Sequence, residues 1–335
     1  MIHSNKVRLL AAAGALMLAL PTAAVAGTQP AVKISGGDGV RGASQVAVGA
    51  FNVGFIFESV DQTAATGGLI GAFGGATKTR STLTGVTPEM MQQVADAAYA
   101  DFVTQLTAQG FTVQAPEVLF AHPTMANPHA QAAPAEINVT LEKGSKGKVT
   151  YFKPAALPAL IMIPGDFTGS GMSSMGINMN AGQADYALSQ YARASGVPVV
   201  DVTYMIDFSN TQRPGAFSFG GLVVNSGLSV SAGYSRLSFI NASGKHSVLK
   251  INQPVAVAGE FVDQQDTTSG TGKTTQAAAN IAGGLAAAAG IGGLRFGKTR
   301  EYEFTAKPGN YEQGATKAAT LANELLVGQL AALRQ

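Results

Sequence analysis

The chain has 335 residues, of which 13% are charged, and it contains 41 glycines and no cysteine. The missing cysteines exclude disulfides, thiol catalysis and cysteine-ligated metal sites, and a chain of this length can bury enough core to fold without disulfides. The formal net charge of +2 provides little field to attract nucleic acid, so no nucleic-acid partner is expected.

The N-terminus predicts a cleavable secretory signal peptide over residues 1–26. Lys6 and Arg8 precede an apolar run at residues 9–20, and the segment ends in Ala-Val-Ala26. The run is too short to span a bilayer, although a retained membrane anchor is the alternative interpretation. Removal of this segment leaves 20 basic and 20 acidic residues, so the mature chain is neutral overall. We therefore expect export to the periplasm, with the outer membrane as a further possible location.

The first half of the mature chain predicts alternating strands and helices. Residues 45–57 are rich in β-branched and aromatic side chains, which favours a strand. The Gly/Thr-rich residues 61–86 indicate a long loop or flap. Thr87 and Pro88 then open a helix that Gly110 ends, because a capping hydroxyl, an N-terminal proline and a terminal glycine are typical helix boundaries.

Further along, residues 111–113 and 118–120 indicate a broken strand, and the proline- and alanine-rich residues 121–148 indicate an exposed excursion. Residues 159–163 are expected to form a buried strand. Helical spacing of apolar side chains over residues 186–192 predicts a second helix.

The middle of the chain predicts a strand followed by a long β-hairpin. Residues 197–208 are almost continuously apolar, as in a strand that is covered on both faces. Two segments with period-two alternation follow and are separated by a turn at residues 241–244, which predicts a hairpin over residues 217–262.

The last third begins with a tract of small residues at 275–294, which allows close packing against a helix, a subunit or lipid. Residues 299–305 predict a returning strand, and residues 311–333 predict a C-terminal amphipathic helix.

The hairpin region contains the run Val-Val-Asp-Val-Thr-Tyr-Met-Ile-Asp-Phe208, a glycine-rich loop through Gly221 and an Asn-Ala-Ser-Gly244 turn. In these features the chain resembles the curli-secretion channel (CsgG) family of exported bacterial envelope proteins. The resemblance implies a periplasmic α/β domain that assembles into rings, with hairpins that can insert into a membrane. Those channels are lipoproteins, and this chain lacks the cysteine for such an anchor, so a ring-forming or accessory relative is the safer implication.

Candidate reaction centres are weak. The loop at residues 267–274 ends in Gly-Lys-Thr but lacks the first glycine of a phosphate-binding loop. His122 and His129 lie in the proline-rich region with no acid nearby, which makes a poor metal site. No cofactor or metal is therefore expected.

We expect one α/β domain over residues 27–335, with a sheet between helices in a three-layer-like arrangement and a hairpin extension. The expected role is non-enzymatic: a homo-oligomer that supports secretion or curli-like assembly at the cell envelope, with lipid or a secreted protein as cargo. Two alternatives stay open: a periplasmic ligand-binding protein that uses loop 165–178, and a hydrolase that uses Asp166 and the nearby serines. The residues expected to carry self-association are Leu228, Val230, Tyr234, Gly283, Gly284 and Gly290.

Overall fold

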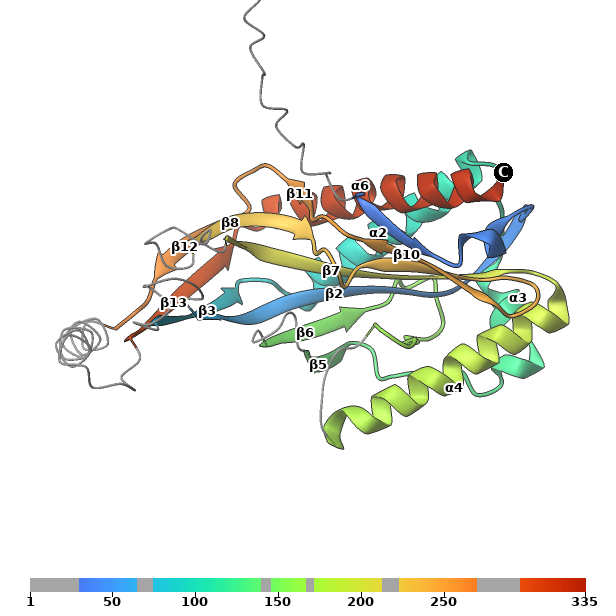
Figure 1. Cartoon of the computed structure of the whole chain (residues 1–335), viewed down its shortest axis with the longest axis horizontal. Coiled ribbons are helices and arrows are strands. Elements are labelled where there is room, and N and C mark those ends of the chain that lie inside the picture. The colour runs from blue at the N-terminus through green and yellow to red at the C-terminus, as the bar shows by residue number, and fades with distance from the viewer. Residues whose placement is uncertain (1–29, 65–74, 140–145, 167–171, 213–222, 270–295) are drawn as a thin grey trace, which may run out of the picture.

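The structure, a computed structural model, describes residues 30–64, 75–139, 146–166, 172–212, 223–269 and 296–335. Within these residues the chain forms a 13-stranded mixed sheet between two helical layers, which confirms the predicted α/β class. Helices α2 (Pro88–Ala108) and α6 (Asn310–Arg334) cover one face, and α4 (Met172–Ser195) lies against the other (Figure 1). No helix in the described ranges is long and apolar enough to cross a membrane.

The remaining helical elements are short. They are η1 (Gly37–Val40), α3 (Pro116–Phe120) and η2 (Pro123–Met125). The strands are β1 (Val32–Ser35), β2 (Gln45–Ala64), β3 (Gly75–Thr84), β4 (Thr112–Gln114), β5 (Ala135–Val139), β6 (Lys146–Phe152), β7 (Val199–Gln212), β8 (Val223–Val230), β9 (Arg236–Ile240), β10 (His246–Ile251), β11 (Val255–Val257), β12 (Val262–Asp266) and β13 (Phe296–Ala306).

The centre of the sheet is a parallel pair, β2 and β7, in which Ala47 faces Val199. Both strands are apolar over most of their length because helices cover both of their faces. On the α2/α6 side, Phe51 packs against Tyr99, Phe102 and Tyr204 with ring centroids 5.4–5.7 Å apart. Rings that are buried in this way contribute most of the hydrophobic stabilisation of a core.

The predicted hairpin is present. Strands β8 and β9 run antiparallel along β7, and β10 and β11 return beside them. The turn lies where the sequence predicts it: the Asn241 side chain accepts hydrogen bonds from the backbone amides of Ser243 and Lys245, each at 2.9 Å. Gly244 has φ +75°, which a residue with a side chain rarely adopts. The returning arm ends earlier than expected, because β11 stops at Val257 and β12 pairs with β13 instead.

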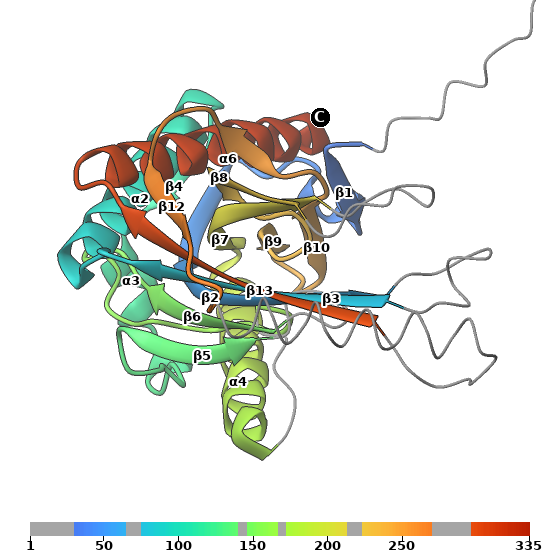
Figure 2. The ribbon, with the colours of Figure 1, turned by 90° about the vertical axis from the view of Figure 1, so that its left-hand side faces the viewer.

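The sheet divides into two leaves at one end of the molecule. The first half of β2 pairs with β7, and its second half pairs with β3. Beyond Ile206, β7 pairs with β8, whereas β3 continues to β13 and β12. Phe208 and Phe304, one from each leaf, meet with ring centroids 5.1 Å apart. Figure 2 shows the leaves from the end at which they separate.

Helix α2 follows the prediction closely. The Thr87 hydroxyl caps its first turn by accepting from the Met90 amide at 3.4 Å, and Pro88 occupies the first position. Its apolar side chains recur at helical spacing, and Phe102 and Leu106 among them are fully buried. The strand expected at residues 299–305 and the helix expected at residues 311–333 are also present, as β13 and α6.

Three predictions are wrong. Residues 75–84 of the expected loop form β3, which is paired on both sides. This strand was not predicted because its residues are mostly small, hydroxyl-bearing or basic, and its two neighbouring strands stabilise it. Residues 118–120 lie in helix α3, because Pro116 occupies its first turn. The expected excursion at 121–148 contains β5 and the start of β6.

The buried strand expected at residues 159–163 is buried but does not join the sheet. One isolated bridge, between Leu160 and Gln131, links it to a neighbouring segment. Helix α4 begins at Met172, well before the predicted residues, and it ends before Gly196, whose φ is +72°.

Candidate functional site

The candidate site is a polar cluster between α4 and the sheet. Side chains on a strand alternate between faces, so β2, β7 and β9 each turn one set toward α4. In register, Asn52, Thr203 and Arg236 lie side by side across three strands. In the next row, Asp201 faces Ser238. All these positions lie opposite the apolar set that packs under α2 and α6.

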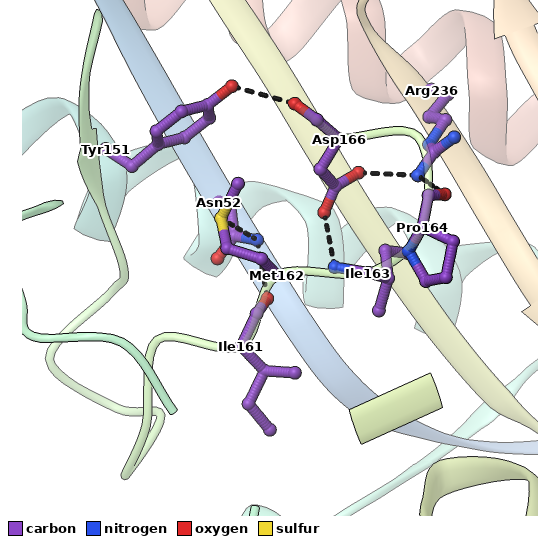
Figure 3. A network of polar contacts seen from close by, with 8 residues as sticks. All are labelled: Asn52, Tyr151, Ile161, Met162, Ile163, Pro164, Asp166 and Arg236. Carbon is purple, nitrogen blue, oxygen red and sulfur yellow. Dashed lines mark hydrogen bonds and ion pairs between the residues drawn. The ribbon is translucent and has the colours of Figure 1, made fainter. Parts of the chain in front are cut away.

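The segment that carries Asp166 closes over this row (Figure 3). The Asn52 amide donates to the Ile161 carbonyl at 2.7 Å, and the Arg236 guanidinium donates to Asp166 Oδ1 at 2.8 Å and to the Pro164 carbonyl. The other oxygen of Asp166, Oδ2, accepts from the Ile163 amide at 3.0 Å. Both carboxylate oxygens of Asp166 are therefore used inside the fold.

The Asp166–Arg236 pair is almost entirely removed from water. The side chain of Asp166 is 0% exposed and that of Arg236 is 13% exposed. Tyr151 supports the same turn, because its hydroxyl donates to the Asp166 carbonyl at 2.9 Å and burial raises the pKa of Tyr151. A buried ion pair contributes little net stability, but loss of one partner is costly because the other charge is left without compensation.

Asp201 is the unusual member of the cluster. It is fully buried on β7, and neither of its carboxylate oxygens accepts a hydrogen bond of ordinary geometry. Burial raises the pKa of Asp201 well above its ordinary value, and the carboxylates of Asp185 and Asp166 raise it further, whereas the charge of Arg236 and the backbone amide of Ala50 oppose the shift. Burial of Asp201 thus shifts its equilibrium toward the neutral acid in the folded protein.

Gly49 makes room for that carboxyl group. A Cβ at Gly49 would lie 2.6 Å from Asp201 Oδ1 and 2.8–2.9 Å from side-chain carbons of Val199 and Leu188. The register between β2 and β7 shifts at the same place. A local irregularity of β2 therefore creates the space that Asp201 occupies.

A second polar contact ties the hairpin to α4. His246, at the start of β10, lies 3.5 Å from Asp185 and 3.3 Å from the Ser189 hydroxyl, both on α4. Burial raises the pKa of Asp185, and the nearby charges of His246 and Arg236 partly offset that effect. The cluster thus joins α4, the hairpin and the segment at 161–166 by charge.

The polar contacts of this cluster hold α4, the hairpin and the segment at 161–166 in place against the sheet. No group of three or more His, Cys, Asp or Glu side chains within the described ranges is arranged to hold a metal ion. Within those ranges, Thr203 Oγ1, Asn52 Oδ1 and Arg236 Nε are buried without a hydrogen-bond partner. Such atoms are the groups that an ordered water between helix and sheet can satisfy.

The sequence identified some of these residues without bringing them together. Asp166 was expected only as a candidate hydrolase residue, whereas the fold places Asp166, Asp185 and Asp201 around Arg236. The sequence did not single out Arg236 or His246 as partners. The available signal was the polar residues at every second position of otherwise apolar strands.

The residues expected to carry self-association differ in their burial, and some of them lie outside the described residues. Leu228 and Val230 are 1% and 0% exposed, because that arm of the hairpin lies in the core of the chain itself. They are therefore not a surface for a second copy. Tyr234 is partly buried and packs against the same core. Gly283, Gly284 and Gly290, with the whole tract at 275–294, lie outside the described residues.

The structure also bears on the two alternatives that use the region after Asp166, the ligand-binding loop and the hydrolase. Of the expected binding loop 165–178, residues 167–171 lie outside the described part, and residues 172–178 belong to α4. Ser174, one of the serines near Asp166, is buried in that helix. His122 accepts from the Thr124 amide and packs edge-on against Tyr191, so its ring has a structural role.

No family model, curated protein or solved structure matches this chain.

Proposed function

We propose that this protein is a non-enzymatic, exported component of the cell envelope, in the periplasm or at the outer membrane. Its role is structural: it forms homo-oligomers that support secretion or assembly there, as the resemblance to the curli-secretion channel family implies. A secreted protein or outer-membrane lipid is the proposed further partner. The feature of the fold that supports this role is the pair of projecting leaves of the sheet.

These leaves run past the helical layers at one end of the molecule (Figure 1). They contain the outer parts of β2 and β3, β7 and β8, and β12 and β13. The leaf made by β3, β13 and β12 ends in an edge strand, since β12 pairs only with β13 in the described sheet. The last four of the five β12 residues are exposed. A strand from another chain can pair with an exposed edge strand.

The charges on β12 do not prevent such pairing. Soluble proteins often protect an edge strand with uncompensated charge. Here Asp263 lies 2.9 Å from Lys307, and Asp266 lies 3.2 Å from Arg300, so both acids are neutralised within the chain. Lys307 also lies 3.4 Å from Glu260. Each of these three acids thus has a basic partner within the chain, which reduces the repulsion between this edge and a copy of itself.

The decisive experiment measures the mass of the mature chain by light scattering after size exclusion, in buffer and in detergent micelles. We expect an oligomer in at least one medium. Lys307→Ala uncovers the charge of Asp263 and Glu260 at a surface where ion pairs add little stability, so it should reduce the oligomer without unfolding the chain. Lys317→Ala, on the exposed side of α6, is the matched control.

Two results would contradict the proposal. A wild-type chain that remains monomeric in both media removes the assembly role. An oligomer that Lys307→Ala leaves unchanged shows that the β12 edge is not the contact on which the argument depends.

A further inference from the structure

The outer face of α4 carries an apolar stripe that the fold leaves uncovered. Met175, Met179 and Tyr186 are 68%, 57% and 64% exposed, and they are three of the five exposed large apolar side chains in the described residues. Spacings of four and seven residues place them in one line along the helix. Single exposed apolar side chains are common on protein surfaces, whereas a cluster of them typically marks an interaction surface.

The same face has no charge. Between Met175 and Gln190 the only charged residue is Asp185, and its carboxylate is turned inward toward His246. A helix on the surface of a soluble protein ordinarily carries charged side chains on the side opposite the core. The outer face of α4 instead presents methionine, tyrosine, glycine and amide side chains, which is the composition of a contact surface.

No described neighbour explains two glycines on this face. A Cβ at Gly176 or at Gly182 would meet no atom of the described residues within 4 Å, so no described element requires glycine at either position. Glycine within a helix costs stability relative to alanine because it loses more backbone freedom on folding. The space above these glycines is therefore available to something outside the chain, such as the side chain of a closely packed helix.

A groove lies beside the stripe. Residues 124–129 and α4 enclose about 520 Å³ between them, lined by side chains that include Asn127, His129, Gln183 and Tyr186. None of the described residues that line it is Asp, Glu, Lys or Arg. The uncharged surface thus extends from the helix into a shallow concavity that can receive an adjoining segment.

We propose that a second copy of this chain docks here, with its α4 antiparallel to the first about a two-fold axis. The helix is self-complementary in this arrangement. With the axis between Asn180 and Ala181, Met179 faces the open position at Gly182 of the second copy, and Met175 faces Tyr186 of the second copy. The pairing of sulfur with an aromatic ring and of a long side chain with a glycine is favourable helix packing.

The polar residues of the stripe fit the same axis. Asn178 faces Gln183 of the second copy, and each amide has both a donor and an acceptor for the other. A two-fold contact of this kind uses the same patch on both copies. An uncharged peptide segment or a neutral saccharide would find similar groups, but neither accounts for this internal match between the two halves of one helix.

This inference rests on the proposed self-association and adds a second contact to it. Helix α4 lies on the opposite side of the sheet from α6 and away from β12, so both contacts can be made at once (Figure 1). One helix face and a shallow groove provide less area than the roughly 800 Å² per partner of a stable interface. The α4 contact alone is therefore weak and depends on protein concentration.

Single-cysteine cross-linking tests the contact directly, because the natural chain has no cysteine. Gly182→Cys places one thiol beside the proposed axis, and a short bis-maleimide should join two copies through it. Glu324→Cys, at an exposed position on α6, is the matched control. We expect severalfold more cross-linked dimer from Gly182→Cys, and equal yields from the two variants would overturn the proposal.

A second variant separates the contact from the fold. Gly182→Leu fills space that is empty in the single chain, so it should leave folding intact and lower the dimer fraction at a fixed concentration. Gly328→Leu on α6, where space is also open, should not lower it. An oligomer that persists by light scattering while Gly182→Cys gives only control yields would refute the α4 contact and leave the proposed function standing. A monomer at all concentrations would refute both.

Discussion

Asp201 should lower the stability of the folded chain more strongly as the pH rises. Its carboxyl group is fully buried and accepts no hydrogen bond of ordinary geometry, and burial raises its pKa in the folded state. An acid with a raised folded pKa stabilises the fold below the unfolded pKa, and this contribution is lost as the pH rises from the unfolded to the folded pKa. Asp201→Asn keeps the shape of the side chain and removes its titration. The unfolding free energy of this variant, relative to that of the wild type, should therefore increase as the pH rises.

The magnitude follows from the unfolded reference. An unfolded Asp has a pKa of about 3.9, and each pH unit above it costs the folded protein about 1.4 kcal/mol until the folded pKa is reached. Relative to the wild type, Asp201→Asn should therefore gain nothing near pH 4 and at most about 4 kcal/mol at pH 7. A buried amide without partners adds a penalty of about 1–3 kcal/mol that does not depend on pH. The slope with pH, rather than the value at one pH, is thus the diagnostic quantity.

Urea unfolding of the mature chain and the variant between about pH 4 and pH 7 measures this slope. Asp38→Asn is the control, since the Asp38 side chain is fully exposed and its loss should change the unfolding free energy little at any pH. If the difference between Asp201→Asn and the wild type is the same across the range, the assignment of Asp201 as a neutral buried acid is wrong.

Two further substitutions test the packing around the site and under α6. Asp166→Asn leaves the buried guanidinium of Arg236 without its counter-charge and should destabilise the fold by about 3–5 kcal/mol in urea unfolding. The control Asp266→Asn, in a partly exposed pair, should cost less than about 1 kcal/mol. Similar losses of stability in the two variants would contradict the buried pairing. Gly314→Ala would place a Cβ 2.5 Å from ring carbons of a phenylalanine and should lower the stability by about 1–3 kcal/mol. Gly328→Ala, in the same helix, meets open space and should raise the stability by about 0.5–1 kcal/mol. Thermal unfolding that ranks the two variants in the reverse order would refute the packing under α6.

The sequence predicted those elements that have strong local signals. Helix α2 has a capping threonine, a proline at its first position and a terminal glycine, and it was placed almost to the residue. The turn of the hairpin was placed because Asn241 and Gly244 satisfy a tight turn by themselves. Strand β3 was missed because its stability comes from ladders to β2 and β13, and no window of the chain contains those neighbours.

The candidate site could be predicted only in part, for a similar reason. Asp166 and Arg236 are 70 residues apart, and nothing local to either indicates that they form a buried pair. The hairpin residues Leu228 and Val230 showed the alternation of a strand with one apolar face, and the structure confirms that alternation. The sequence could not tell whether that face meets another copy or the chain's own helix, and it meets α6, whose Gly314 approaches Leu228 closely.

The pairing of β2 with β7 has a consequence for the order in which the protein is made and folded. Ala47 and Val199 are neighbours in space but about 150 residues apart along the chain, and the two strands run parallel. Closing so large a loop is slow, so the central ladder is completed only after most of the polypeptide has been synthesised. We propose that this protein is exported, and if it crosses the membrane unfolded, this delay is an advantage, because the polypeptide passes through before its two central strands pair.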